Sequence, residues 1–144
     1  NIKEIKKFLK YANILKLAKE EAILFFNSND PREISDSLVK RPDVIITDGG
    51  NPVLWFINGI AGSTQINNSN KKIIDTTGAG DAFLAGLISQ LGYYSNEMKE
   101  ITIQNHLKFA CACGLLTCLG EGAIEQQPDR EKVYEFLERF GSDI

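Results

Sequence analysis

The spacing of apolar residues along this chain alternates between a helical and a strand-like period. Helical spacing begins at Ile2, Ile5 and Leu9, which lie among lysines and predict an amphipathic helix with a basic, solvated face. Further helices are predicted over 19–26, 33–40, the stretch containing 83–91, 101–119 and the segment after Pro128, and strands over 13–18, 43–47, 53–57 and up to Ile74. Alternating strands and helices predict an α/β layered fold with a largely parallel sheet.

The turns between these elements carry clear signals. Asn58-Gly59 after the strand 53–57 predicts a hairpin, and Pro31 suits the first position of a helix. The polar stretch 63–70 predicts a loop, and 93–100 predicts irregular chain. The apolar run 101–119 is too short and too rich in small residues for a membrane span, so it predicts a core helix.

The central stretch is the short apolar run ending at Ile74, followed by a glycine-containing turn and a helix start. This helix has an apolar face formed by Phe83, Leu84, Leu87, Ile88 and Leu91. Backbone amides at Gly78, Ala79, Gly80 and Asp81 lack intrahelical acceptors, and the helix dipole adds about half a positive charge there. Such a turn can bind a phosphate.

Asp81 stands where a bound anion would sit, which is electrostatically odd for anion binding alone. A carboxylate beside a transferring phosphoryl group is suited to accept a hydroxyl proton. An alternative is also open, because Asp is favoured in the first turn of a helix and Gly-Ala-Gly can be a simple tight connection.

Composition limits the function classes. The chain has 144 residues, 43% hydrophobic and 24% charged, which is ordinary for one soluble domain with a real core. A net charge of −3 and a pI of about 5.2 favour neither nucleic acid nor an anionic membrane as a partner. The only methionine is Met98, so residue 1 is not a translation start and the chain is processed, excised or incomplete.

Three cysteines, Cys111, Cys113 and Cys118, lie close together. Their odd number and the lack of a secretory leader favour a reducing, cytoplasmic location. Cys111 and Cys113 are two positions apart on a predicted helix and point to different faces, which disfavours a zinc site and favours small packing residues. His106 is the only histidine and has no catalytic partner in the pattern.

The string from Asp75 to Phe83 closely resembles the carboxy-terminal signature of the ribokinase-like (PfkB) carbohydrate kinases. The resemblance implies that Gly78, Ala79 and Gly80 stabilise the migrating phosphoryl group and that Asp81 is the catalytic base. It also implies a ribokinase-like three-layer α/β/α fold with a mostly parallel sheet. Residues 1–144 would then be the carboxy-terminal nucleotide-binding and catalytic part of the domain, without its amino-terminal half.

Two looser motifs precede this string. Glu21 falls on a family glutamate associated with the magnesium and phosphate region, although Ala18 replaces the usual Asn; an ordinary first-turn acid is the alternative. Thr47 and Gly49 resemble the Thr-x-Gly turn that contacts ATP, and Pro52 stands where a second glycine is common.

A third loose motif lies after the cysteine-rich helix. Here the resemblance implies that Gly120, Gly122 and Cys111 line the adenine side of the nucleotide, with Cys111 standing where fructokinase-like members often have Asn. Backbone carbonyls near Asp75, Thr77 and Thr117 would surround a monovalent cation such as K⁺.

The resemblance therefore implies an ATP- and Mg²⁺-dependent kinase that phosphorylates a sugar hydroxyl, most similar to the fructokinase-like branch. Ribose, a keto-deoxy sugar acid and a nucleoside stay open as acceptors, as does a homodimer formed through missing or exposed elements. One rival is a nucleotide-binding segment without catalysis. A second rival is a dinucleotide-dependent oxidoreductase, which is disfavoured because the third glycine of its fingerprint is replaced by Phe83.

Overall fold

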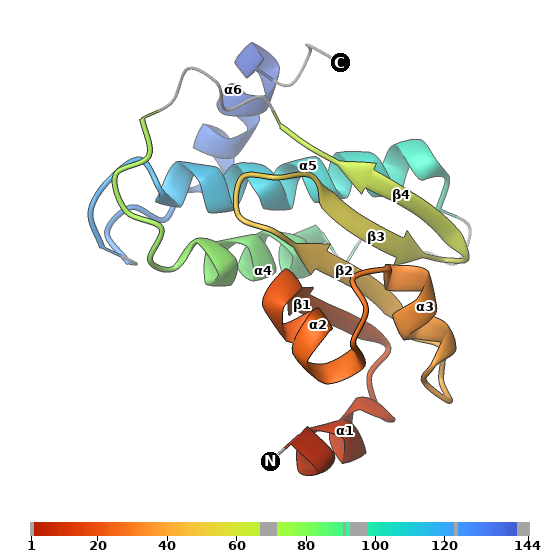
Figure 1. The fold of residues 1–144 in the computed structure, drawn as a ribbon. Helices are drawn as coiled ribbons and strands as arrows, with labels where there is room; N and C mark the ends of the chain where they lie inside the picture. Colours follow the sequence, from red (N-terminus) through yellow and green to blue (C-terminus); the bar gives the residue numbers. More distant parts are fainter. Residues whose placement is uncertain (1, 67–71, 91, 93–97, 123, 141–144) are drawn as a thin grey trace. The chain divides into compact units, whose positions relative to one another are not determined.

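A computed structural model describes residues 2–66, 72–90, 92, 98–122 and 124–140. The chain divides into two compact units, Asn1–Thr64 and Gln65–Ile144. Figure 1 shows the strands gathered in the first unit and the three longest helices in the second. None of the helices in the described ranges has the length and apolar character needed to cross a lipid bilayer.

The first unit contains a four-stranded sheet with strand order β1-β2-β3-β4. Its elements are, in chain order, α1 (Ile2–Leu9), β1 (Ile14–Ala18), α2 (Lys19–Phe26), α3 (Pro31–Asp36), β2 (Asp43–Thr47), β3 (Val53–Ile57) and β4 (Ile60–Thr64). β1 and β2 are parallel, whereas β2–β3 and β3–β4 are antiparallel. The mostly parallel sheet expected from the sequence is not met among these strands, because short turns link β2, β3 and β4 and only longer crossovers allow parallel pairing.

The core of the first unit lies against the parallel strands. Its buried side chains come from β1, β2, α2 and α3 and are Leu15, Leu17, Ala22, Ile34, Val44 and Ile46. Trp55 is also fully buried, and its Nε1 donates a hydrogen bond to Thr64 Oγ1 at 3.0 Å. A Cβ at Gly62 would overlap the Trp55 ring, so only glycine fits there. The predicted hairpin is confirmed, with Asn58 and Gly59 both at positive φ.

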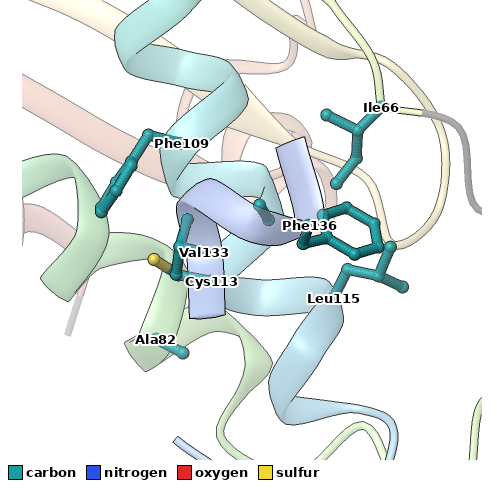
Figure 2. Close-up of a cluster of buried hydrophobic side chains, with 8 residues drawn as sticks. Ile66, Ala82, Phe109, Cys113, Leu115, Val133 and Phe136 are labelled. Carbon is teal, nitrogen blue, oxygen red and sulfur yellow. The ribbon is translucent and has the colours of Figure 1, made fainter. Parts of the chain in front are cut away.

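The second unit is built from α4 (Ala79–Gln90), α5 (Glu100–Thr117) and α6 (Arg130–Phe140). Figure 2 shows its core, where side chains of α4, α5 and α6 and Ile66 meet; the buried members are Ile66, Ala82, Phe109, Ala112, Cys113, Leu115, Val133 and Phe136. α4 and α5 pack closely, because a Cβ at Gly86 would lie 2.8 Å from Cys113 Sγ and 3.1 Å from Ala110 Cα. Packing of Cys113 between helices agrees with the predicted structural role of the cysteines.

The predicted strand ending at Ile74 is wrong. Residues 72–76 form no regular secondary structure, and Ile73 and Ile74 are 43% and 53% exposed. The Ile74 amide donates instead to the Cys118 carbonyl oxygen at 2.8 Å, so the segment is bound to the end of α5. An apolar run this short does not decide between a strand and an extended segment.

Other boundaries shift by a few residues. The helix predicted over 33–40 is α3, which begins at Pro31 and ends at Asp36. The predicted loop 63–70 starts later, since β4 runs to Thr64, and its residues 67–70 lie outside the described ranges. Glu100 begins α5, and 93–97 lie outside the described residues. On α4, Phe83 and Leu87 are buried as predicted, but Leu84 and Ile88 are exposed; Leu91 is not described.

Candidate active site

The glycine turn that precedes α4 has a shape only glycine adopts easily. Gly78 has a φ of +80°, in the left-handed region, and forms the turn with Thr77. α4 then begins at Ala79, close to the carboxy-terminal end of α5. A Cβ at Gly114 would lie 3.0 Å from the Ala79 carbonyl oxygen, so the glycine lets α5 approach the start of α4 closely.

Three of the four amides predicted to be bare are bare. Among the residues that the structure describes, the amides of Gly78, Gly80 and Asp81 donate to no protein acceptor. The expectation for Ala79 is wrong, because its amide donates to the Thr76 carbonyl oxygen at 3.2 Å. The first bond of the helix runs from the Ala82 amide to the Gly78 oxygen at 2.8 Å. Bare amides at a helix start favour a bound anion.

Asp81 is exposed and lies in the first turn of α4. Within the described part of the chain, its carboxylate makes no hydrogen bond or ion pair. A first-turn acid stabilises a helix by its charge alone, so the position is compatible with a structural role. It is equally compatible with a carboxylate that is ready to accept a proton from a ligand, because no internal bond has to break first.

Asp75 joins the glycine turn to the loop after α5. Its carboxylate accepts hydrogen bonds from the Thr77 hydroxyl at 2.7 Å, the Thr77 amide at 2.9 Å and the Gly122 amide at 3.2 Å. These bonds, the hydroxyl first, hold the pKa of Asp75 below its ordinary value. The structure thus brings together Asp75, Thr77 and Gly122, three residues that the sequence assigned to neighbouring parts of one site.

Thr117 differs from this group. Its side chain is fully buried, and its hydroxyl donates to the Cys113 carbonyl oxygen at 3.0 Å. The hydroxyl is therefore used within α5, and only the backbone of Thr117 is left for the predicted cation. Among the described residues, no three side chains of His, Cys, Asp or Glu converge on a point where a metal ion could bind.

Gly120 lies in the loop after α5, whereas Cys111 lies on α5 beside the core. A Cβ at Gly120 would overlap the Gln126 side chain, so the loop after α5 packs tightly there. Cys111 is half-buried and packs against the core cluster of Figure 2. Burial raises the pKa of Cys111 to about 12 and that of Cys113 to about 11, so both are protonated thiols near neutral pH.

In the first unit, the predicted nucleotide turn follows β2. Gly49 has a φ of +54° and no atom within 4 Å of where a Cβ would stand, so the backbone of the turn is open. The Asn51 amide donates to the Asp48 carbonyl oxygen at 2.9 Å and closes the turn before Pro52. The Thr47 hydroxyl faces the Leu17 carbonyl oxygen at the long distance of 3.4 Å, which leaves it a weakly held donor.

Glu21 has a clear structural role. Its Oε2 accepts a hydrogen bond from the Ala18 amide at 2.8 Å, which caps the start of α2 in the manner of half a capping box. Glu21 is exposed, and within the described part of the chain its other carboxylate oxygen accepts no hydrogen bond. A single carboxylate oxygen fits a magnesium ion that is held mainly by phosphates and water.

The sequence interpretation missed the ion pair between Lys19 and Asp48, whose Nζ and Oδ2 are 2.8 Å apart. The hydrogen bond from Lys19 is the main cause that lowers the pKa of Asp48, and the bond to Asp48 raises the pKa of Lys19. Opposite charges directly after two strands that pair in parallel were the signal that could have revealed it.

The sequence matches the pattern of the pfkB family carbohydrate kinase over residues 2–130. It is 33% identical over 141 residues to the probable fructokinase-6, chloroplastic, of Arabidopsis thaliana, covering 93% of this chain and 36% of that protein. The fold is similar to a fructokinase with bound ATP from Xylella fastidiosa, with a TM-score of 0.84, 23% identity and coverage of 96% of this chain and 46% of that one.

A second solved structure adds a higher identity. It is a fructokinase double mutant from Vibrio cholerae O395 in a form with fructose, ADP and potassium ion bound. The TM-score is 0.80 at 26% identity, over 94% of this chain and 44% of that one. The chain thus spans less than half the length of each of these three proteins.

Proposed function

Because the chain belongs to the pfkB family of carbohydrate kinases, we propose that it takes part in ATP-dependent phosphoryl transfer to a sugar hydroxyl, with fructose as the acceptor. The observation that carries this proposal is the exposed start of α4. There the bare amides of Gly78, Gly80 and Asp81 lie in one turn with a carboxylate that has no internal partner. The three similar proteins described above are fructokinases, which favours fructose as the acceptor.

In the proposed reaction, the acceptor hydroxyl oxygen forms a bond to the γ-phosphorus of ATP. The bond between that phosphorus and the bridging oxygen breaks, ADP leaves, and the hydroxyl proton passes to the Asp81 carboxylate. The amides of the turn stabilise charge on the transferring phosphoryl oxygens, while Ala79 contributes through its small side chain because its amide is already used. Proton transfer can be late in a loose transition state, so a carboxylate can serve as the proton acceptor.

The proposed nucleotide contacts are Thr47 and Gly49 after β2, and Cys111, Gly120 and Gly122 in and after α5. The open backbone at Gly49 and the exposed Gly122 support contacts through main-chain groups. Cys111 would contribute an apolar, uncharged surface, because its buried thiol stays protonated.

The proposed ions have separate places. Mg²⁺, which would neutralise phosphate charge, would be held by phosphates, water and the available oxygen of Glu21. K⁺ would be held by backbone carbonyls near Asp75, Thr77 and Thr117. The potassium ion named for the Vibrio fructokinase supports the second assignment, and the bond from Gly122 to Asp75 brings two of the loops concerned together.

We also propose that residues 1–144 are the carboxy-terminal part of a longer kinase, because they match less than half of each compared relative. The rest of that kinase would supply most contacts to the sugar. A segment that binds nucleotide without catalysing transfer is the main rival. Ribose, a keto-deoxy sugar acid or a nucleoside are the alternative acceptors.

The test uses two proteins: the 144-residue chain and the complete polypeptide that contains it. Calorimetric titration with MgATP measures nucleotide binding by each protein. Release of ADP is then measured with a panel of fructose, ribose, a keto-deoxy sugar acid and a nucleoside. ADP release that depends on fructose supports the proposal. Binding of ATP with no acceptor-dependent turnover in the complete polypeptide would establish the non-catalytic rival instead.

A further inference from the structure

Two oppositely charged side chains link the carboxyl ends of β1 and β2. Ala18 and Thr47 are the last register partners of this parallel pair. Lys19 follows Ala18 and begins α2, and Asp48 follows Thr47 and begins the turn to β3. Lys19 Nζ and Asp48 Oδ2 are 2.8 Å apart, so a charge-assisted hydrogen bond ties the start of α2 to that turn.

Asp48 in turn organises the residues after it. Its backbone carbonyl accepts the Asn51 amide at 2.9 Å, and the Asn51 side chain also hydrogen-bonds to the Asp48 carboxylate. Gly49, with its φ of +54°, lies inside this bonded loop, and its backbone faces open space. The shape of the open turn therefore depends on where the Asp48 carboxylate is held.

The sign of the charge at Asp48 needs an explanation if the turn contacts ATP. A carboxylate inside a turn that binds phosphates repels them, and the repulsion weakens when a cation is paired with it at contact distance. Lys19 is that cation. The pair is partly shielded, with side chains 40% and 28% exposed, whereas the Arg41–Asp36 pair of the same unit is 72% and 49% exposed.

We propose that Lys19 is a positioning residue for the nucleotide: through Asp48 it holds the Thr47–Gly49 turn in its open shape and neutralises a carboxylate that would otherwise repel phosphate. This inference rests on the proposed function, since it assigns the turn to ATP. It predicts that breaking the pair weakens ATP binding and leaves the chemical step intact, because neither side chain acts on the transferring group.

The test compares Lys19→Met, Asp48→Asn and the double variant, with Asp36→Asn as the matched control at the other ion pair. In the complete kinase polypeptide, each single variant should raise KM for MgATP about two- to fivefold, which is the range that a part-exposed ion pair supports. kcat should change less than twofold. KM for MgATP of the double variant should not exceed that of the single variant with the higher KM, since each single substitution already removes the same interaction. The differences should shrink at high salt.

A second readout does not depend on activity. In the 144-residue chain, amide hydrogen exchange at Asn51 should be faster in Lys19→Met than in the unmodified chain and unchanged in Asp36→Asn. Unchanged exchange at Asn51 overturns the inference. Faster exchange with an unaltered KM also overturns it, because the tether would then serve the fold alone. If the unmodified polypeptide transfers no phosphate and binds no ATP, the proposed function fails, and the exchange result still shows whether Lys19 holds the turn.

Discussion

The most direct prediction concerns Asp81. Replacing Asp81 with Asn keeps the size and polarity of the side chain but removes its ability to accept a proton. If the proposed function holds, kcat of the complete polypeptide that contains this chain should fall by roughly 10²- to 10⁴-fold, which is the usual contribution of a positioned general base. KM for ATP should change little, because the amides of Gly78, Gly80 and residue 81 remain available.

The structure also sets how much stability this variant should lose. The Asp81 carboxylate makes no hydrogen bond or ion pair among the described residues, so the substitution breaks no protein contact. Its only structural contribution is the favourable charge in the first turn of α4. The midpoint of thermal unfolding should therefore shift by no more than about 2 °C, as expected for an exposed position without special contacts.

Glu131→Gln is the matched control, because Glu131 is an exposed first-turn acid of α6 in the same unit. Both variants should unfold at nearly the same temperature, but only Asp81→Asn should lose turnover. Initial rates of ADP release at saturating ATP and sugar give kcat directly. Turnover of Asp81→Asn within threefold of the unmodified enzyme would refute the assignment of Asp81 as the base.

Three further predictions concern stability and reactivity. Gly86→Val should destabilise the chain by about 1–3 kcal/mol through overpacking between α4 and α5, measured by denaturant unfolding, whereas Ala85→Ser on the exposed side of α4 should not. Asp75→Asn should lower the unfolding temperature at pH 7. Because the native pKa of Asp75 is lowered, its stabilising contribution is fully present above its unfolded pKa of about 3.9 and is lost as pH falls through the native pKa. The difference in unfolding temperature between Asp75→Asn and the unmodified chain should therefore be smaller at pH 3 than at pH 7. At pH 8 only about one part in a thousand of Cys113 is thiolate, so Cys111 and Cys113 should react far more slowly with a thiol reagent in the native chain than in denaturant; equal rates would contradict their burial.

Many of the helices and strands could be predicted from local sequence patterns. β1, β2, β3 and the Asn58-Gly59 hairpin have the predicted positions, because strand period and turn chemistry act over a few residues. The helices α5 and α6 also lie close to their predicted ranges. The hairpin signal already implied antiparallel pairing of β3 with β4, whereas the antiparallel pairing of β3 with β2 was not predicted.

The errors around the glycine turn have a common cause. The sequence pattern predicts Ile74 in a strand and a bare amide at Ala79, yet both amides donate to carbonyl oxygens that are not strand partners.

 The Ala79 donor finds Thr76 within its own turn, whereas Ile74 finds Cys118 at the end of α5, more than forty positions away. Sequence spacing identifies which amides lack a helical acceptor, but it does not show which carbonyl oxygens the folded chain brings to them.

The sequence also located several site residues without showing how they are linked. Asp75, Thr77 and Gly122 were assigned separately, and the structure joins them through the Asp75 carboxylate. The Lys19–Asp48 pair was missed because it becomes visible only when β1 and β2 are known to be neighbours. A bond between residues 29 positions apart has no local periodicity that a single sequence reveals.

Contacts within the chain itself position the start of α4. Gly114 lets α5 approach the Ala79 carbonyl, and Asp75 fixes Thr77 while it binds Gly122. The bare amides are therefore fixed in direction before a phosphate arrives, and such preorganised donors stabilise developing charge without a cost of rearrangement. Asp81, in contrast, is exposed and makes no hydrogen bond or ion pair in the described chain, so in the proposed reaction the bound acceptor would set its direction at proton transfer. Loss of the acceptor's orienting contacts should consequently impair proton transfer more than phosphate binding.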